Sequence, residues 1–501
     1  MPVFVGCDLG TMGTKAAVVD ADGQIVGDAF EEVLLRSPAP GRVEQDLAEI
    51  EASAHRTIRT ALERSGRAAD VAGVAFSGQM SGIGSVDDRF EPATYFDSWL
   101  DTRCEPYIVR MQEAADLVTR LSGCPPTYSH GPKILWWRDE RPDDFARIAR
   151  FIVPGAYVAG RLCGLATADA FIDRTYIHFS NLADTAESCW SPELLEAFGL
   201  DDGKLPRIVH PEEIVGEVSR EGSEHTGLPA GTPVAAGAGD QAAASLGAAV
   251  VDPGQAFDSA GTASVFAMCV AGFAPDLAQK TLLASHSVVD GVFIALAFIN
   301  GGGLALRWFR DEVVPELAGD PDAYATLDAW AEETEPGAGG LLWYPHVQGG
   351  VLPPRPHARG AWVGVTSAHG RGHLYRAILE GIAYEYALWA AVAPVELTEA
   401  RVLGGGARSA LWNRIKADVL GIDWVPMMRE ECGVLGDALI AAAATGHVGD
   451  LPATARAWQE TGERVRPDPE RHRAYGALAE AYRELGERLH PVFQRLGGRQ
   501  A

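Results

Sequence analysis

Two aspartates stand where a predicted buried strand ends at a glycine turn, and this placement suits phosphate chemistry. Asp8 lies near the end of the apolar segment VFVGCDLG, and Asp240 follows the Gly237–Gly239 run in PVAAGAGDQ. Magnesium binds few carboxylates together with water and phosphate oxygens, so isolated aspartates are suitable ligands. Phosphoryl transfer also needs a group that accepts a proton from the attacking hydroxyl, which a carboxylate can do. An ordinary alternative for Asp240 is the N-cap of the helix that follows it.

Four glycine-bearing turns follow predicted strands. Glycine lets successive backbone N–H groups face one anion, and two of these turns precede a predicted helix whose N-terminus also favours negative charge. Each turn alone could be a simple tight turn. Together, on the two similar lobes that a repeated pattern in the chain predicts, the turns indicate a nucleotide site. The sequence has no G-x-x-x-x-G-K-[ST], which excludes a P-loop enzyme, and no G-x-G-x-x-G after its first strand, which disfavours a dinucleotide site. The turns are Gly10–Thr14, Gly261–Thr262, Gly301–Gly303 and Gly404–Gly406.

One pattern occurs twice, half the chain length apart. The first residues predict strand, turn, strand, an Asp22-Gly23 turn and a third strand from Gln24, followed by a helix over residues 47–64 and a buried strand from Val71. QAFDSAGTASVFAMCV, from Gln255, repeats the order of apolar strand, Asp, small residues, Gly-Thr and apolar strand. The repeat predicts two similar α/β lobes built around equivalent hairpins. Asp258 in the second hairpin could be a functional or a structural residue.

Composition narrows the class of protein. At about 100–200 residues per domain, 501 residues predict two to four domains with a sizeable core, because 47% of the residues are hydrophobic and 22% charged. The net charge of −26 disfavours a nucleic-acid partner. Seven scattered cysteines favour reduced thiols in the cytoplasm, and the sequence shows neither a secretory signal nor a membrane span.

Several segments together resemble the FGGY family of carbohydrate kinases. CDLGTMGTKAAVVD is similar to the family's first phosphate hairpin, GAGDQAAASLG to its catalytic-aspartate segment and DSAGTAS to its second phosphate hairpin. GAWVGVTSAHGRGHLYRAILEG resembles the C-terminal signature, LGGGARSALWNRIKADVLG the adenine-binding loop, and VLGDALIAAAATG the helix that closes that site. These matches run in the family's order from residue 3 to about 447. Beyond them, the spacing of Tyr475, Leu478, Tyr482, Leu485 and Leu489 predicts an amphipathic helix over residues 470–496 that packs along this apolar face.

The resemblance implies an α/β protein of two actin-like, ribonuclease-H-like lobes with a ligand cleft between them. Residues 1–245 would form the sugar-binding N-terminal lobe and residues 246–501 the nucleotide-binding C-terminal lobe. The expected reaction transfers the γ-phosphoryl group of ATP to a sugar hydroxyl with Mg²⁺ present. Members of the family are often dimers, and no interface is apparent in the sequence.

The resemblance also assigns roles to individual residues. Asp240 would be the general base and, with Asp8, would hold the metal. Arg307 is the least distinctive of the nucleotide residues, since a helix-surface arginine is its ordinary alternative. The residues assigned to the nucleotide are Thr11, Gly13, Thr14, Lys15, Gly261, Thr262, Gly303, Arg307, Gly405, Gly406 and Asn413.

The acceptor side is similar to the xylulose kinases of this family, with one departure. AFSGQMSGIGSVD matches their S-G-Q-M-H-G loop, but Ser81 stands at the histidine position, and a serine is shorter and carries no charge. Trp99, Asp101 and Arg103 match the family's W-x-D-x-R pattern, and Tyr128 falls where glycerol kinases have a substrate-contacting tyrosine. Both aromatic residues could instead simply pack. The glycerol kinases' R-E pair is missing, which disfavours glycerol. The residues assigned to the sugar are Gln79, Met80, Trp99, Asp101, Tyr128, Asp240 and Gln241.

These observations predict an ATP-dependent kinase of a small ketose, with a D-xylulose-like pentulose as the acceptor. Other acceptors remain open: ribulose, a ketotetrose, a polyol or gluconate. A different class, a non-catalytic actin-like regulator that binds only nucleotide, would need no sugar-lining strand. Both Gly239-Asp240-Gln241 and the Trp99/Asp101 segment are intact, which favours the kinase.

Overall fold

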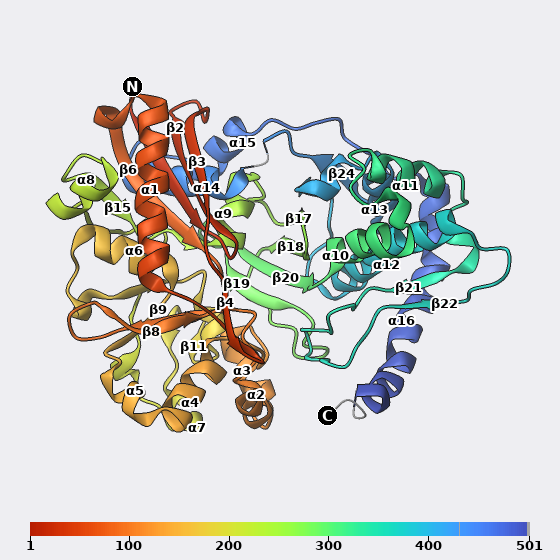
Figure 1. Cartoon of the computed structure of the whole chain (residues 1–501), viewed down its shortest axis with the longest axis horizontal. Coiled ribbons are helices and arrows are strands. Elements are labelled where there is room, and N and C mark those ends of the chain that lie inside the picture. Colours follow the sequence, from red (N-terminus) through yellow and green to blue (C-terminus); the bar gives the residue numbers. More distant parts are fainter. Residues whose placement is uncertain (430, 498–501) are drawn as a thin grey trace. The chain divides into compact units, whose positions relative to one another are not determined.

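The chain folds into two α/β units in the computed structural model, which describes residues 1–429 and 431–497 (Figure 1). The first unit comprises Met1–Val251, Ala271–Ile294 and Glu431–Gln459. The second comprises Asp252–Val270, Ala295–Glu430 and Glu460–Ala501. The expected lobe boundary between residues 245 and 246 stays a prediction. No helix within the described residues is both long and apolar enough to cross a membrane.

The predicted N-terminal hairpin forms the centre of the first unit's main sheet. Its strand order is β14-β15-β6-β1-β2-β3, with β16 also paired to β6. β1 runs antiparallel to β2 and parallel to β6, which places the ends of β1 and β6 at the same edge of the sheet. The strands are β1 (Val3–Leu9), β2 (Gly13–Asp20), β3 (Ile25–Glu32), β6 (Val71–Gly78), β14 (Ile214–Glu217), β15 (Pro233–Ala235) and β16 (Ala238–Gly239).

Helices cover this sheet because their apolar faces match it. α1 (Leu47–Ser65) begins after Asp46, whose side chain accepts from the Ala48 N–H, and packs against β2 and β3. α14 (Cys432–Ala444), rich in small residues, packs against β1 and β6 so closely that a Cβ on Gly6 would lie 2.1 Å from the Val434 carbonyl oxygen. The unit's other helices are α2 (Glu105–Gln112), α3 (Ala115–Ser122), α4 (His130–Glu140), α5 (Pro142–Arg147), α6 (Pro154–Cys163), α7 (Pro192–Phe198), α8 (Arg220–Thr226), α9 (Asp240–Gly247) and α15 (Leu451–Trp458).

A smaller sheet of the first unit has the order β4-β5-β8-β7-β9. β5 pairs antiparallel with β8, so that Gln45 lies opposite Phe96. The strands are β4 (Arg36–Ala39), β5 (Arg42–Gln45), β7 (Ile83–Val86), β8 (Pro92–Asp97) and β9 (Arg150–Ile152); β10 (Phe171–Asp173), β11 (Ala183–Asp184), β12 (Cys189–Trp190), β13 (Arg207–Val209) and β19 (Leu283–His286) complete the unit.

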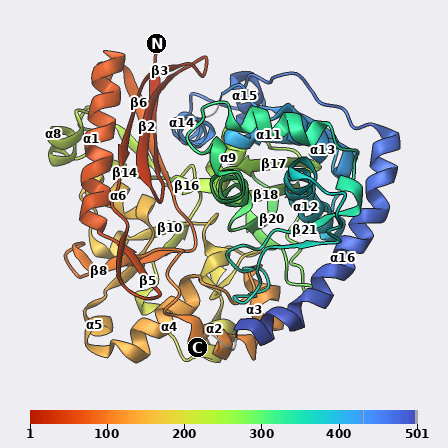
Figure 2. The same ribbon diagram turned by 45° about the vertical axis from the view of Figure 1, so that its right-hand side comes forward.

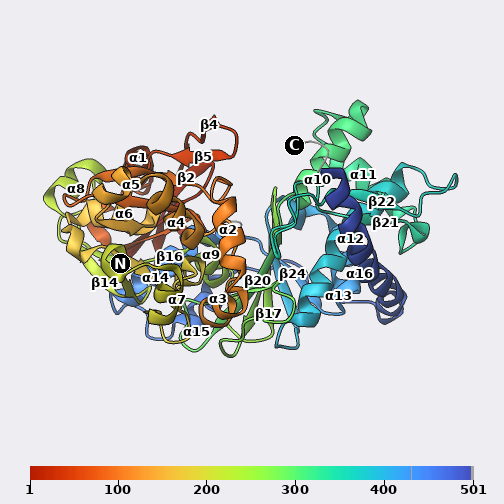
Figure 3. The ribbon, with the colours of Figure 1, turned by 90° about the horizontal axis from the view of Figure 1, so that it is seen from below.

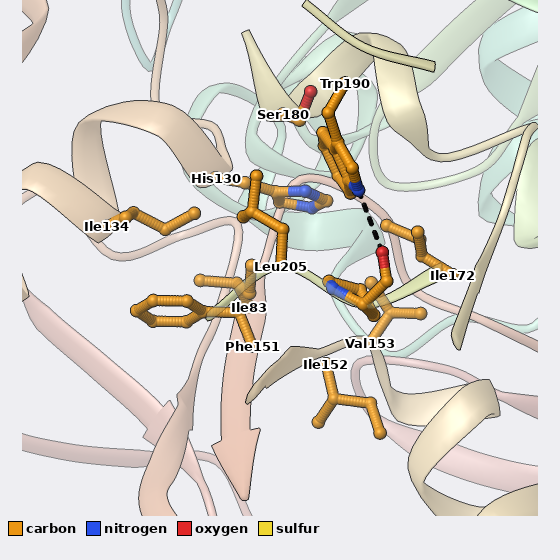
Figure 4. Close-up of a pocket in the computed structure, with 11 residues that line it drawn as sticks. Ile83, His130, Ile134, Phe151, Ile152, Val153, Ile172, Ser180, Trp190 and Leu205 are labelled. Carbon is orange, nitrogen blue, oxygen red and sulfur yellow. Dashed lines mark hydrogen bonds between the residues drawn. The ribbon is translucent and has the colours of Figure 1, made fainter. Parts of the chain in front are cut away.

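A cavity of about 10 Å³ lies among apolar side chains of this unit (Figure 4). Ile83, Phe151 and Leu205 line it together with the buried His130, and Trp190 donates a hydrogen bond to the Pro206 carbonyl oxygen at its border (2.9 Å). Such a space has room for about one water molecule. It is too small for a sugar, and the residues that line it include none of the predicted site residues.

The second unit repeats the strand arrangement of the first. Five neighbouring strands of its six-stranded sheet lie in the order β20-β18-β17-β23-β24, with β17 antiparallel to β18 and parallel to β23. This matches β3-β2-β1-β6-β15 strand for strand along the order of pairing, so the predicted pair of similar lobes is confirmed. The strands are β17 (Gln255–Ala260), β18 (Ser264–Val270), β20 (Phe293–Ile299), β21 (Leu342–Tyr344), β22 (Ala361–Val363), β23 (Glu399–Leu403) and β24 (Asp423–Pro426).

The second unit's helices include the long C-terminal helix that the sequence predicts. α16 (Pro469–Gly497) buries Tyr475 and Tyr482 and packs along α12 (Arg371–Val392), as Figures 2 and 3 show. The Tyr475 hydroxyl donates to Glu380 (2.9 Å) and the Tyr482 hydroxyl to Glu385 (2.6 Å), so the predicted apolar face also carries two buried polar anchors. The other helices are α10 (Gly302–Trp308), α11 (Ala323–Glu332) and α13 (Ala410–Leu420).

Candidate active site

Acidic side chains gather where β1 and β6 meet α14 in the first unit. The Ser77 hydroxyl on β6 lies 2.8 Å from Asp437 Oδ2 on α14 and 3.3 Å from Asp8 Oδ1 on β1. Burial raises the pKa of Asp8, and burial together with the charge of Asp8 raises the pKa of Asp437 well above its usual value. Asp437 is fully buried, and its Oδ1 has no hydrogen-bond partner within the described part of the chain. The sequence analysis did not identify Asp437, although it predicted the helix that carries it.

Asp240 is the first residue of α9, with Gly239 as the N-cap. Its Oδ1 accepts the N–H of the next residue, Gln241 (2.7 Å), and the structure shows no side-chain cap of the helix. The N-cap alternative is therefore not observed. Burial and the charge of Asp8 raise the pKa of Asp240 to about 7. A carboxylate with that pKa accepts a proton efficiently near neutral pH.

The space beside Asp8 suits a small cation. A Cβ on Gly433 would lie 3.3 Å from Asp8 Oδ2, so the glycine leaves that oxygen accessible. Within residues 1–429 and 431–497, no three His, Cys, Asp or Glu side chains are grouped to hold a metal ion by themselves. Magnesium commonly takes one or two carboxylates and fills its remaining positions with water and phosphate oxygens, so Asp8 and Asp240 fit this ion.

The β1–β2 turn places its predicted nucleotide residues in different surroundings. Gly10 N–H bonds to the Gly13 carbonyl (3.0 Å), and a Cβ on Gly13 would lie 2.3 Å from the ring of Phe30. Thr14 is fully buried, and its hydroxyl has no hydrogen-bond partner among the described residues. Lys15 forms a half-exposed ion pair with Glu431 (2.7 Å). Lys15 is thus the most accessible cation of this turn.

The predicted acceptor loop continues from the end of β6. Gln79 is buried, whereas Met80 is half-buried and contacts Gly239: a Cβ there would lie 2.5 Å from Met80 Cε. The loop therefore touches the residue that precedes Asp240.

Ser81, at the histidine position, has a left-handed backbone with φ 66°. Its hydroxyl donates to the Tyr128 carbonyl oxygen (2.9 Å), and the buried Lys133 ammonium donates to the carbonyl oxygens of Ser81 (3.2 Å) and Tyr128 (2.6 Å). The Ser81 side chain is therefore used within the protein, while the Tyr128 side chain is half-buried.

The W-x-D-x-R segment contains one partly exposed side chain, that of Trp99, and two side chains, those of Asp101 and Arg103, that bond within the protein. Trp99 is half-buried, and its indole N–H donates to Thr11 Oγ1 (2.9 Å). Asp101 is fully buried and accepts from Arg103 Nε (2.9 Å) and the Val43 N–H (2.7 Å). The Arg103 guanidinium also bonds to Asp97 (2.7 Å). Both oxygens of Asp101 are thus engaged by protein donors, whereas the Trp99 side chain remains partly exposed.

Gln45, which the sequence analysis did not identify, joins these segments. It is fully buried at the end of β5, its Oε1 accepts from Gln79 Nε2 (2.5 Å), and its Nε2 donates to the Thr11 carbonyl oxygen (3.1 Å). In the sequence, Gln45 lies in the short and largely polar segment GRVEQD, which does not indicate a hydrogen-bond partner for its side chain.

The second unit brings four predicted nucleotide residues together. Gly261 and Thr262 are exposed in the β17–β18 turn. A Cβ on Gly303 would lie 2.0 Å from the Gly261 carbonyl oxygen, so only glycine permits this approach. Arg307, exposed on α10, reaches Thr262 Oγ1 (3.3 Å). The guanidinium and the turn thus lie side by side, an arrangement that suits an anion.

The loop after β23 contains the remaining predicted nucleotide residues. Gly405 is exposed, and a Cβ on Gly406 would lie 2.5 Å from the Trp412 ring. Asn413 is buried on α13, where its Nδ2 donates to the Ala407 carbonyl oxygen (2.7 Å). The Asn413 side chain therefore fixes the loop after β23 by a hydrogen bond to the loop's backbone.

Comparison with known proteins identifies the family. The model for the N-terminal domain of the FGGY family of carbohydrate kinases matches residues 3–247, and the model for its C-terminal domain matches residues 257–445. A gluconokinase from Bacillus subtilis (strain 168) is 26% identical over 467 residues, which cover 90% of this chain and 89% of that protein. A xylulose kinase from the same strain is 26% identical over 501 residues and covers 95% of both chains.

The fold comparison agrees with these sequence matches. The crystal structure of xylulose kinase from Rhodospirillum rubrum superposes with a TM-score of 0.89 at 27% identity and covers 98% of this chain and 99% of that one. The predicted α/β class with two actin-like lobes is therefore confirmed. The chain belongs to the FGGY family of carbohydrate kinases and is a sugar kinase.

Proposed function

We propose that this kinase transfers the γ-phosphoryl group of ATP to a hydroxyl of a small ketose, with a D-xylulose-like pentulose as acceptor and Asp240 as general base. The observation that carries the proposal is the position of Asp240 at the start of α9, where burial and, after it, the charge of Asp8 raise its pKa to about 7. A purely structural helix-start aspartate would have no need of an acidic neighbour.

In the proposed reaction, the acceptor hydroxyl oxygen forms a bond to the γ-phosphorus while its proton passes to the Asp240 carboxylate. The bond from the γ-phosphorus to the β–γ bridging oxygen breaks, and ADP leaves with that electron pair. Mg²⁺ held by Asp8 and Asp240 would supply neutralisation of the phosphate charge. Lys15, Thr11 and Thr14 in the first unit are proposed to serve the phosphates.

The second unit is proposed to hold the nucleotide. Gly261, Thr262, Gly303 and Arg307 would bind phosphate oxygens, which the exposed turn and its neighbouring guanidinium support. Gly405 and Gly406 would frame the adenine and ribose, and the buried Asn413 would fix their loop.

On the acceptor side, the half-buried candidates are Met80, Trp99, Tyr128 and Gln241. Gln241 supports this role because its Oε1 is enclosed and has no hydrogen-bond partner within the described residues. Gln79 and Asp101 are buried with protein partners, so we propose that they act by holding the loop and Trp99 in place.

Gluconate is the second candidate acceptor. The observation that favours it is that the Bacillus subtilis gluconokinase and xylulose kinase are equally similar to this chain, at 26% identity. Ser81 adds to this. It stands at the histidine position of the xylulose kinases, but its hydroxyl donates to the Tyr128 carbonyl oxygen and so does not supply the contact of a histidine side chain.

The test is ADP release in a coupled assay with Mg²⁺-ATP and a panel of ketopentoses, ketotetroses, polyols, glycerol and gluconate. The blank is the Asp240→Asn variant, which we expect to bind ATP but to lose about 10²–10⁴-fold in turnover, the usual contribution of a general base. A kcat/KM that is highest for D-xylulose supports the proposal. A kcat/KM that is highest for gluconate makes gluconate the acceptor in place of the ketose. Turnover of every acceptor at the level of the blank contradicts the proposed function.

A further inference from the structure

Four hydrogen bonds, one buried and three partly buried, connect three of the predicted site segments to one residue outside them. They are Trp99 Nε1 to Thr11 Oγ1 (2.9 Å), Thr11 Oγ1 to Gln79 Oε1 (3.4 Å), Gln79 Nε2 to Gln45 Oε1 (2.5 Å) and Gln45 Nε2 to the Thr11 carbonyl oxygen (3.1 Å). The bonds close into a ring through Thr11, which contributes both its side chain and its main chain. We call this set of bonds, with Thr11, Gln45, Gln79 and Trp99 as its members, the glutamine ring.

The direction of every bond in the glutamine ring follows from the Thr11 carbonyl oxygen, which can only accept. Gln45 Nε2 donates to it, so Gln45 Oε1 accepts from Gln79 Nε2. Gln79 Oε1 therefore accepts the proton of Thr11 Oγ1, and that hydroxyl oxygen accepts in turn from the Trp99 indole N–H. Each amide thus has one satisfied orientation, and the ring resists rotation of either glutamine.

The glutamine ring reaches the acceptor side at two places. Trp99 is half-buried and partly exposed, unlike the fully buried Asp101 of the same segment. Gln79 precedes Met80, whose thioether contacts Gly239, the N-cap of the helix that begins with Asp240. A displacement of Gln79 is therefore passed to Met80 and to the start of α9.

We propose that Gln45 is a positioning residue for the acceptor sugar, because it is the member of the glutamine ring that fixes both Gln79 and the Thr11 turn. Gln45 is fully buried and touches the sugar only through Gln79, Thr11 and Trp99. This role rests on the proposed function, since it assumes that Trp99 and the loop after β6 bind the acceptor. It extends that function to a strand, β5, to which no motif assigns a part.

The test is the isosteric change Gln45→Glu in the full chain. A carboxylate oxygen opposite the Thr11 carbonyl can no longer donate, so two acceptors face each other and the glutamine ring opens. We expect kcat/KM for the best acceptor of the panel to fall about tenfold or more, because misplaced binding groups weaken both binding and alignment. The KM for the acceptor should rise clearly more than the KM for ATP, which the variant also affects through the proposed phosphate contacts of Thr11. Isothermal titration of the same sugar without ATP should show the same loss of affinity.

Three further variants separate positioning from folding. Gln279→Glu makes the same chemical change at an exposed site of the first unit, and its kinetics should equal those of the unaltered protein. Thr11→Val removes the hydroxyl of the glutamine ring and should raise the acceptor KM. In a double variant, Thr11→Val and Gln45→Glu should be clearly less than additive, since each opens the same ring.

The outcomes distinguish this inference from the proposed function. An unchanged acceptor KM in Gln45→Glu overturns the inference alone, as do additive effects with Thr11→Val. Equal increases in the KM for ATP and sugar, with a lowered unfolding temperature, would show a structural role only and also overturn it. If the unaltered protein turns over no acceptor, the proposed function fails and this inference fails with it.

Discussion

The β1–β2 hairpin of the first unit and the β17–β18 hairpin of the second are built from the same sequence pattern, with an aspartate at corresponding places. Asp8 is half-buried beside one hydroxyl, that of Ser77, and beside the acidic Asp437. Asp258 is fully buried, 2.5 Å from the Lys416 ammonium and 2.7 Å from the Tyr386 hydroxyl. One hairpin concentrates negative charge, and the other neutralises it.

The difference shows how one fold yields a reactive and a structural carboxylate. Near Asp8, like charges and burial raise the pKa values of neighbouring acids, including that of Asp240 to about 7. At Asp258, the ion pair with Lys416 and the tyrosine hydroxyl satisfy the carboxylate, as buried charges require. The comparison assigns chemistry to the first hairpin and stability to the second.

The largest expected effect is on stability, in the second hairpin. Lys416→Met leaves Asp258 buried without its cation, and breaking a buried pair in this way costs about 3–5 kcal/mol of the free energy of unfolding. Trp412 and Trp424 lie beside the Lys416 ammonium, so denaturant unfolding followed by tryptophan fluorescence reports this region. Arg488→Met, in the same unit, is the control: its ion pair with Glu484 is largely exposed, and its loss should cost less than about 1 kcal/mol. Equal losses in the two variants would remove the contrast between the hairpins.

The second effect is on activity, in the first hairpin. Asp8→Asn should lower kcat about 100-fold at saturating Mg²⁺-ATP, because one of two proposed metal ligands loses its charge. The unfolding midpoint should stay equal or rise, since a like charge leaves the acidic cluster. Initial rates measure the expected loss of kcat, and denaturant unfolding of the same preparation measures the unfolding midpoint. A variant with full activity, or one that simply unfolds, would make Asp8 resemble Asp258.

Sequence patterns predict the hairpins because they are local: apolar runs broken by Asp and Gly-Thr dictate strand, turn and strand. The same applies to α1 and to α16, where periodic apolar residues match the observed faces. The roles of Asp8 and Asp258 could not be separated this way, since Lys416 stands 158 residues beyond Asp258 and Asp437 comes from a helix near the C-terminus.

Gln45 illustrates the other limit. Its strand has four residues, and nothing in a buried glutamine indicates its partners until Thr11 and Gln79 are folded against it. Predicted ligand residues that the structure buries with protein partners, such as Gln79 and Asp101, show that a matching motif does not establish exposure.

The third effect is on pH dependence and sharpens the contrast between charged and neutralised surroundings. A general base works ionised, so kcat/KM should be flat above about pH 7 and fall about tenfold per pH unit below it, following the pKa of Asp240. Because the charge of Asp8 raises that pKa, the residual activity of Asp8→Asn should show its midpoint at lower pH. A midpoint unchanged by Asp8→Asn would mean that the two carboxylates do not interact. The check is the pH profile of both proteins with the best acceptor.

The smallest expected effect is on the free energy of unfolding, and it measures the cost of placing several acidic side chains beside the first hairpin. In the unfolded chain the Asp437 carboxyl ionises near its usual pKa of 3.8, whereas burial and Asp8 hold its proton to much higher pH in the folded protein. The folded state therefore binds the extra proton, and the free energy of unfolding should fall as pH rises above 4. Asp437→Asn removes this proton-binding difference and keeps an amide oxygen that accepts from the Ser77 hydroxyl, so at pH 7 it should stabilise the protein on the order of 1 kcal/mol and flatten the pH dependence. Unfolding curves at pH 5 and pH 7 measure this, and destabilisation at pH 7 would mean that the acidic cluster of the first hairpin, like the ion pair of the second, holds the fold together.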